Sequence, residues 1–222
     1  MGRSERAAAR TYREFRTVHG SQMIIAAALA ASLSAPALAG LDRPDARPER
    51  DGPAALTDQP VGGPAEQHQR GLMYLYGQGV PKDDAAAFYW IRRAAEQGLA
   101  EAQSSLGFMY LRGRGVAPDP EQAARWFRSA AEQGSPAGQV NLGLAYARGN
   151  GVPRNAAEAV KWLRKAAEQG DPPAQYYLGI AYATGEGVAQ NDAEAIRWFR
   201  MAAAQGDPKA RYALQSLSSN AR

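Results

Sequence analysis

The chain has 222 residues, no cysteine, two histidines and a formal net charge of +4 at pH 7. Without cysteine it has no disulfide framework, no lipoprotein anchor and no zinc site built from clustered Cys and His. The first 39 residues hold five basic and two acidic side chains, so residues 40–222 hold 21 basic and 20 acidic ones. That balance gives no support to nucleic-acid binding, which needs a concentrated basic surface.

Residues 1–39 have the pattern of a secretory signal peptide. Five arginines lie in the first 16 residues, an uncharged, moderately apolar stretch begins at Met23, and Ala37-Leu38-Ala39 matches an Ala-x-Ala cleavage signal. We therefore expect cleavage after Ala39 and a periplasmic or secreted protein. The alternative is a membrane anchor, which needs about 20 apolar residues. The stretch from Met23 to Ala39 is shorter and contains Pro36, so no stable membrane insertion is expected after cleavage.

The next segment, residues 40–62, is rich in proline, glycine and charges of both signs, and it has almost no bulky apolar side chain. Such a segment cannot bury enough apolar surface to offset the entropy lost on folding. It is therefore predicted to be a disordered linker between the leader and the rest of the chain.

A tandem repeat of 36 residues organises residues 63–222. The four tryptophans of the chain follow this period, and tyrosine and glycine series follow it without an insertion or deletion. The main series are Trp90, Trp126, Trp162 and Trp198; Tyr74, Tyr110, Tyr146 and Tyr182; Gly77, Gly113, Gly149 and Gly185; and Gly98, Gly134, Gly170 and Gly206. We place the repeats at about 63–98, 99–134, 135–170 and 171–206, followed by a C-terminal capping helix in residues 207–222.

Each repeat contains two segments with the apolar spacing of an amphipathic helix. In the second repeat, Ala102, Leu106 and Tyr110 form one stripe, and a similar stripe surrounds Trp126. A Gly-x-Gly turn separates the segments, and Asp119, at a place taken by Asp or Asn in every repeat, can cap the second helix. The unit is predicted to be a helix-turn-helix with helices of about 13–15 residues. Stacked units bury aromatic side chains that a single pair cannot.

The repeat resembles the Sel1-like repeat family, which is related to the tetratricopeptide repeat. The family pattern is A-x-x-x-L-G-x-x-Y-x-x-G-x-G-V, then D/N, then A-x-x-W-x-x-x-A-A-x-x-G. The second repeat matches it at Ala102, Leu106, Gly107, Tyr110, Gly113, Gly115, Val116, Asp119, Ala123, Trp126, Ala130, Ala131 and Gly134. The resemblance covers about residues 63–216 and implies an all-α fold: an α/α solenoid whose helix pairs form a right-handed superhelix with a concave groove. It also implies an adaptor that holds other proteins together, and several family members are periplasmic.

The sequence offers little material for catalysis. Residues 40–222 contain one histidine, His68, and no Gly-x-Ser-x-Gly elbow that would present a serine nucleophile. The recurring Gly-x-Gly pairs lie between predicted helices, so they are interpreted as turns and not as phosphate-binding loops. We therefore predict a protein that is not an enzyme and that holds no metal and no cofactor. Some secreted family members, stapled by paired cysteines, are linked to β-lactam binding, and this chain lacks those cysteines.

Candidate binding residues lie on the first helix of each repeat, at positions that change from repeat to repeat. In tetratricopeptide repeats the groove side of these helices lines the ligand. The candidates in this chain are His68, Tyr76, Ser104, Phe108, Arg112, Leu144, Arg148, Tyr176, Ile180 and Tyr212. Aromatic and arginine side chains are enriched at protein interfaces. Packing between repeats would also explain Phe108 and Tyr176, and that alternative stays open.

The leading hypothesis is a non-catalytic periplasmic adaptor that binds another envelope protein or peptide through its concave groove. The resemblance suggests a membrane sensor kinase or an envelope-assembly complex as the partner. One alternative is a cell-wall or β-lactam-handling enzyme. Another is a non-catalytic peptidoglycan- or oligosaccharide-binding protein, which would use Tyr and Trp rings as stacking platforms. Core packing is the preferred interpretation of the repeated tryptophans.

Overall fold

The computed structural model describes residues 62–219. The predicted leader, the predicted linker up to residue 61, and residues 220–222 lie outside the described residues. Residues 62–219 form nine α-helices and no β-strand: α3 (Pro64–Tyr76), α4 (Asp84–Glu96), α5 (Ala100–Arg112), α6 (Pro120–Glu132), α7 (Pro136–Arg148), α8 (Ala156–Glu168), α9 (Pro172–Thr184), α10 (Asp192–Ala204) and α11 (Pro208–Ser219). In this part of the chain, no helix has both the length and the apolar character that crossing a membrane requires.

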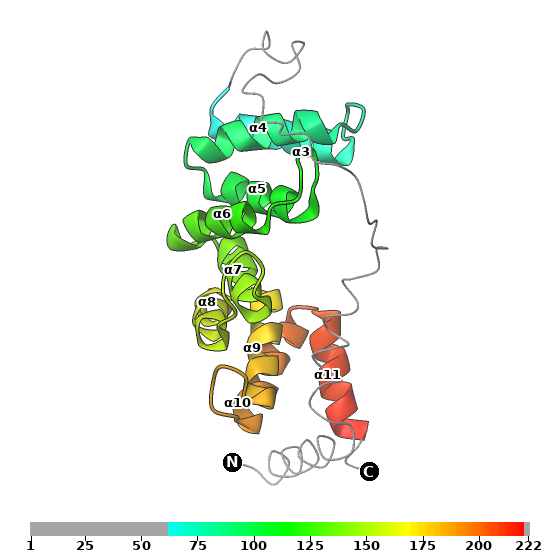
Figure 1. The fold of residues 1–222 in the computed structure, drawn as a ribbon. Coiled ribbons are helices and arrows are strands. Elements are labelled where there is room, and N and C mark those ends of the chain that lie inside the picture. Colours follow the sequence, from blue (N-terminus) through cyan, green and yellow to red (C-terminus); the bar gives the residue numbers. More distant parts are fainter. Residues whose placement is uncertain (1–61, 220–222) are drawn as a thin grey trace, which may run out of the picture.

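The helices pack in pairs that stack in chain order. α3 packs with α4, α5 with α6, α7 with α8 and α9 with α10. The second helix of each pair also packs on the first helix of the next, and α10 packs on α11. Figure 1 shows the stack running from α3 and α4 to α11, with the direction of the helices turning along it. The predicted all-α solenoid of four helix-turn-helix repeats with a C-terminal helix is confirmed.

The helix ends follow the predicted signals. The side chains of Asp83, Asp119, Asn155 and Asn191 accept hydrogen bonds from backbone N–H groups in the first turns of α4, α6, α8 and α10. The first helix of each repeat ends at a glycine in the left-handed conformation, with φ 64° at Gly113. Other residues adopt this conformation only at a cost in free energy. Each helix of the four repeats has 13 residues, so the pairs have matched lengths.

A glycine in the middle of each first helix lets the two helices of a repeat approach closely. A Cβ on Gly107 would lie 2.6 Å from the Phe127 ring and 3.0 Å from the Ala123 carbonyl oxygen. The same contact recurs where Gly71 faces Ile91, Gly143 faces Leu163 and Gly179 faces Phe199. The residue after each repeated tryptophan therefore packs directly on the backbone of its partner helix.

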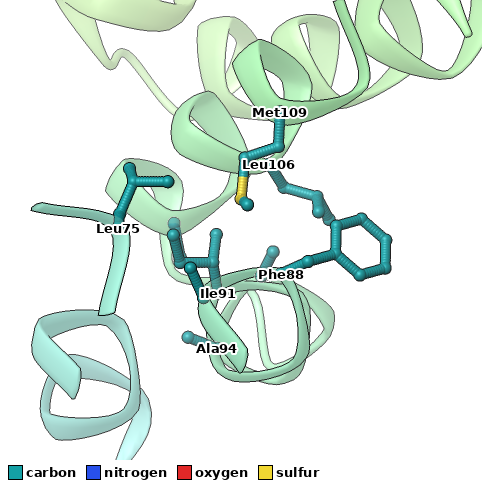
Figure 2. Close-up of a cluster of buried hydrophobic side chains, with 9 residues drawn as sticks. Leu75, Phe88, Ile91, Ala94, Leu106 and Met109 are labelled. Atoms are coloured by element: carbon teal, nitrogen blue, oxygen red, sulfur yellow. The ribbon is translucent and has the colours of Figure 1, made fainter. Parts of the chain in front are cut away.

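The hydrophobic core is divided among the interfaces between repeats. Figure 2 shows one cluster, in which Leu75 of α3 and Ile91 of α4 lie close to Leu106 and Met109 of α5. Leu106 and Met109 have no exposed surface. Trp126, in the second helix of the next repeat, packs on the edge of the same cluster. Each repeat thus completes the core of the repeat before it, as expected for a solenoid.

The tryptophans differ in burial. Trp90, Trp162 and Trp198 are buried, whereas Trp126 is half-buried. Trp162 packs with Phe127 of the preceding repeat, and Trp198 packs with residues of α8 in the same way. The interpretation of the tryptophans as core residues is confirmed for the three buried ones.

Buried glutamines form another series with the 36-residue period, which the sequence analysis did not single out. Gln103 of α5 accepts a hydrogen bond from Nε2 of Gln133 at 2.7 Å and donates one to the Ala95 carbonyl of α4 at 3.3 Å. Gln139 and Gln175 repeat both bonds in the next two repeats. Because an amide buried without partners costs about 1–3 kcal/mol, these bonds fix the register of three helices at once.

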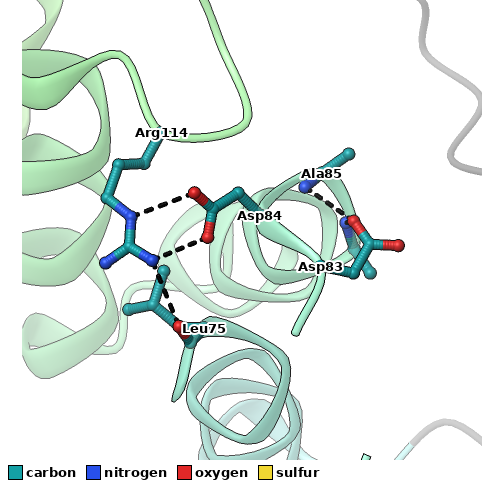
Figure 3. Close-up of polar contacts among 6 residues, drawn as sticks. Leu75, Asp83, Asp84, Ala85 and Arg114 are labelled. Carbon is teal, nitrogen blue, oxygen red and sulfur yellow. Dashed lines mark hydrogen bonds and ion pairs between the residues drawn. The ribbon is translucent and has the colours of Figure 1, made fainter. Parts of the chain in front are cut away.

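The Gly-x-Gly turns rest on the second helix of the preceding repeat. A Cβ on Gly115 would lie 2.0 Å from the Asp84 carbonyl oxygen. The neighbouring Arg114 donates to the Asp84 carboxylate, with Nη2 2.6 Å from Oδ1, and to the Leu75 carbonyl at 3.1 Å (Figure 3). The hydrogen bond from Arg114 lowers the pKa of Asp84. In the fourth repeat the signs of the two charges are reversed, because the turn supplies the acidic residue: Glu186 accepts a hydrogen bond from Arg154 of the third repeat.

Candidate functional site

A hollow of about 260 Å³ opens between the first helices of repeats two to four and the N-terminal end of α11. We call it the concave groove. Its lining residues are Phe108, Leu111, Arg112, Ala123, Ala124, Phe127, Asn141, Leu144, Ala145, Arg148, Asn150, Tyr177 and Lys209. α5 and α7 contact each other directly, so the first helices of these repeats meet along the groove. The groove therefore draws on several repeats and cannot form within one.

The structure brings four of the predicted site residues together in this groove. Phe108 and Arg112 come from α5, and Leu144 and Arg148 occupy the equivalent positions of α7. The Phe108 side chain is 39% exposed, so it does not serve only as packing between repeats. Each pair is four residues apart on its helix, which places its two side chains on one face.

The charged groups at the groove are all cationic. No Asp or Glu is among the residues that line it in the described part of the chain. The guanidinium carbon of Arg112 lies 5.6 Å from the centroid of the Phe108 ring, within cation–π range. Nε of Arg148 is inaccessible and has no hydrogen-bond partner within residues 62–219. Lys209, from α11, is exposed and adds a third cation from the far end of the solenoid.

Two predicted site residues are buried between helices and do not reach the groove surface. Ser104 is 6% exposed, and its Oγ lies 3.4 Å from Oγ of Ser135. Tyr176 is 9% exposed and contacts Tyr177 and Phe199, with ring centroids 5.4 and 5.8 Å away. Burial raises the pKa of the Tyr176 phenol to about 12. For Tyr176, packing in the core of the fourth repeat, next to α11, is the observed role.

Helical geometry explains this difference. A step of four residues advances about 40° around a helix, so a stripe of three residues at that spacing turns by about 80°. The predicted stripe through Ser104, Phe108 and Arg112 therefore starts between helices and ends in the groove. The true groove face includes Tyr177, one residue after the predicted Tyr176, and Asn141 at the equivalent position of α7. Their spacing to the residues at i+3 and i+7, as in Asn141, Leu144 and Arg148, was the signal that could have identified them.

The remaining predicted residues lie outside the groove. Nε2 of His68 is hydrogen-bonded to Oγ of Ser105 at 3.0 Å, which joins α3 to α5. Tyr76 is 63% exposed at the end of α3, and Tyr212 is 73% exposed on α11. Ile180 is half-buried and packs on the cluster that contains Phe199. The structure does not gather these four residues into one surface with the groove.

The family is established by comparison with known proteins. Residues 67–99, 100–135, 136–171 and 172–207 each match the Sel1 repeat, and together they make up more than half of the chain. The chain belongs to the Sel1 repeat family. The four matched Sel1 repeats follow the 36-residue period of the sequence, and α11 begins directly after the last one.

Two solved structures are similar to the Sel1 repeat domain. A Sel1 repeat protein from Oxalobacter formigenes has 40% sequence identity and a TM-score of 0.65, with 68% of this chain and 62% of that chain covered. The protein c5321, a protective antigen of uropathogenic Escherichia coli strains that displays an SLR fold, has 42% identity and a TM-score of 0.66. That comparison covers 69% of this chain and 33% of c5321. The chain thus spans less than two thirds of the length of either structure.

The family indicates which kind of role a Sel1 repeat domain usually has. Sel1 repeat proteins generally mediate protein–protein interaction and are typically non-catalytic scaffolds. Within residues 62–219, no three His, Cys, Asp or Glu side chains are grouped as metal ligands. His68 lies away from the groove, and burial lowers its pKa, with the charge of Glu101 acting in the opposite direction. The buried Trp90, Trp162 and Trp198 do not offer open faces for stacking against a sugar.

Proposed function

We propose that this Sel1 repeat protein is a non-catalytic adaptor that binds a polypeptide partner in the concave groove. One observation carries the proposal: exposed Phe108 lies beside Arg112 and Arg148 in a recess built by rigid helices. Aromatic and arginine side chains in such recesses dominate the free energy of protein association. Among the described residues, the groove lining contains no Ser, Cys, His, Asp or Glu that would act as a nucleophile or a general base.

We further propose that the protein acts in the cell envelope, as a periplasmic or secreted protein, after cleavage behind Ala39. The basic start, the apolar stretch and the Ala-x-Ala signal of the first 39 residues support this location. A partner such as a membrane sensor kinase or an envelope-assembly complex would be encountered there. Alkaline phosphatase fused after Gly40 should be active, because this enzyme folds only outside the cytoplasm. An inactive fusion, or a mature N-terminus at Met1, would contradict the location.

Site-specific photo-crosslinking tests the groove as the binding surface. A photoreactive phenylalanine analogue at Leu144, inside the groove, is expected to trap a protein partner in growing cells. The same analogue at Arg125, which is exposed on α6 outside the groove, is the matched control. Crosslinks that form equally at both positions, or only at Arg125, would contradict the proposal.

The paired substitution Arg112→Ala with Arg148→Ala separates binding from folding. Arg112 is exposed and neither arginine forms an ion pair within residues 62–219, so the melting temperature should stay within a few degrees of the parent. Crosslinking at Leu144 should fall strongly, because the guanidinium groups supply charge-assisted hydrogen bonds to the partner. A variant that crosslinks as well as the parent would show that the two arginines are not contacts.

A further inference from the structure

The concave groove has the chemistry to select one kind of polypeptide. We propose that it binds an acidic segment, in which carboxylates flank one aromatic or large aliphatic side chain. The inference rests on the proposed function and adds the chemistry of the partner to it.

The three cations at the groove have no acidic partner among the described residues. Arg112, Arg148 and Lys209 form no ion pair within residues 62–219, and no carboxylate lines the groove there. Some cations elsewhere on the described surface do form ion pairs. Ion pairs join Arg92 with Glu96, Arg114 with Asp84, Arg154 with Glu186, Lys161 with Glu158, and Arg197 with Glu194. Positive charge that is left unpaired in a recess favours a partner that brings negative charge.

Each arginine is held in a way that suits a carboxylate. The Arg112 guanidinium lies over the Phe108 ring, which limits its motion and reduces the entropy lost on binding. Arg148 is half-buried, and its Nε is enclosed without an acceptor among residues 62–219, so a carboxylate would approach the two Nη groups. A carboxylate at the edge of a guanidinium can accept two parallel hydrogen bonds, the geometry that arginine favours.

The centre of the groove is apolar and selects a second feature of the partner. Phe108 and Leu144 occupy equivalent positions on α5 and α7, and the buried Ala123, Ala124 and Phe127 lie behind them. An aromatic or large aliphatic side chain would cover this surface and displace water from it. Apolar contact at the centre with charged groups around it is the arrangement of a binding hot spot.

The small number of cations favours a polypeptide over a polyanion. Residues 62–219 carry 17 basic and 15 acidic side chains, and the groove holds three unpaired cations. Nucleic acid binding instead draws on a continuous basic track that neutralises many phosphates. A few carboxylates beside one apolar side chain match the groove in both charge and apolar area.

A random dodecapeptide library displayed on phage and selected on the purified full chain tests the inference. Enriched peptides are expected to combine two or more Asp or Glu residues with a Trp, Phe or Leu. A fluorescein-labelled synthetic copy of an enriched peptide then gives the dissociation constant by fluorescence anisotropy. The paired variant R112E/R148E should weaken this peptide by about tenfold or more, and Phe108→Ala should do so by about tenfold. A copy with Asn and Gln in place of Asp and Glu should bind the parent equally poorly.

Matched variants control for net charge and for loss of apolar surface. R125E/R200E makes the same charge change at two exposed arginines on α6 and α10, outside the groove, and should bind like the parent. Met201→Ala removes an exposed apolar side chain of similar exposure to Phe108, and it should also leave binding unchanged. Because R112E/R148E carries acidic groups in the groove, it should bind a Lys-substituted copy of the peptide better than the parent does.

The possible results separate the two proposals. Enrichment of neutral or basic peptides whose binding depends on Arg112 would overturn the acidic partner but keep the adaptor function. Peptides that bind R112E/R148E as well as the parent, or no enrichment at all, would count against both. Tighter binding of a 20-nucleotide single-stranded DNA than of the acidic peptide, through the same two arginines, would overturn the choice of a polypeptide.

Discussion

Gly107 lies in the middle of α5, where alanine would favour the helix by about 1 kcal/mol. The chain nevertheless has glycine there, because a Cβ would meet the Phe127 ring at 2.6 Å. The ring is rigid and is itself 2% exposed, so it cannot move aside without disturbing the core. Close packing of the two helices of a repeat thus depends on one absent side chain.

Gly107→Ala is therefore expected to destabilise the domain although it raises helix propensity. Overpacking in a filled core costs about 1–3 kcal/mol. Thermal or urea unfolding followed by circular dichroism would measure the change. In a Phe127→Leu background the same substitution should cost less, because a Cβ on Gly143 would lie 2.9 Å from Leu163, farther than the 2.6 Å between a Cβ on Gly107 and the Phe127 ring. An equal cost in both backgrounds would show that the ring contact is not the cause.

His68 provides a test of electrostatics at a single residue. Burial lowers its pKa below the ordinary value of 6.5. Because the folded state resists protonation more than the unfolded state, the stability that His68 contributes is complete above pH 6.5 and is lost as the pH falls through the lower folded pKa. Proton NMR titration of the full chain should show one imidazole titrating below pH 6.5, and His68→Gln should remove it. A normal pKa for that signal would contradict the burial of the ring.

The role of a single residue could be predicted where the same residue type recurs in every repeat. Asp83, Asp119, Asn155 and Asn191 recur at one position, and all four cap helices as expected. The groove residues do not recur, so only their helix and approximate face could be inferred. Lys209 could not be found at all from the sequence, because it reaches the groove only through the accumulated turn of the solenoid.

Each helix pair is joined to its neighbours by the glutamine series as well as by apolar packing. Gln139 accepts a hydrogen bond from Gln169, the residue that follows α8, and donates one to the Ala131 carbonyl of α6, and it is 4% exposed. Apolar contacts tolerate small shifts, whereas these bonds have a defined direction and length. The series therefore sets the register of the helices on one another.

Gln139→Ala is expected to destabilise the domain by about 1–3 kcal/mol, because it leaves a buried carbonyl and the Gln169 amide with one partner fewer. Gln69→Ala, at an exposed glutamine of α3, is the matched control and should change stability by less than about 0.5 kcal/mol. Urea unfolding of both variants measures the difference. Equal stabilities for the two variants would show that the buried hydrogen bonds contribute nothing net.

The repeated tryptophans should differ in how much they contribute to the free energy of unfolding. Trp162→Ala removes a buried side chain and is expected to cost about 3–5 kcal/mol. Trp126→Ala should cost less, because Trp126 is half-buried and packs only on the edge of its cluster. Chemical denaturation of the two variants checks the order, and a greater loss for Trp126→Ala would contradict it.

At the level of elements, the sequence predicts more of the fold than of the site. Apolar periodicity and terminal glycines place every helix of the repeats, since both signals are local. The face of each helix that meets the groove depends on neighbours that local signals do not describe. Val140 and Tyr176 show this, because they lie beside groove residues in the sequence but are buried between helices.

The solenoid as a whole is closed at its C-terminal end by α11. Ala210 is fully buried, and Ala213 and Leu214 pack on the cluster that contains Tyr176 and Phe199. Repeats contribute stability mainly through contacts with their neighbours, so removal of a terminal helix should destabilise the adjacent repeat most.

Deletion of residues 207–222 should therefore weaken the fourth repeat more than the first. Hydrogen exchange measured by mass spectrometry is expected to show faster exchange in α9 and α10, with α3 and α4 little changed. A uniform increase across all helices would show instead that the array unfolds as one unit. Because the deletion also removes Lys209, the affinity for an acidic peptide should fall together with this local protection.

The opposite polarity of the turn contacts makes the repeats non-interchangeable. Arg114 forms an ion pair with Asp84 of the repeat before it, whereas Glu186 forms one with Arg154 of the repeat before it. If the turn of the second repeat were moved behind the third, its arginine would approach Arg154, and attraction would become repulsion. Each such pair is worth about 0.2–1 kcal/mol at a partly exposed site, so the two together favour one order of the repeats. The four repeats therefore differ in the neighbour that their turns favour, and arrays with the repeats in another order should be less stable than the natural array.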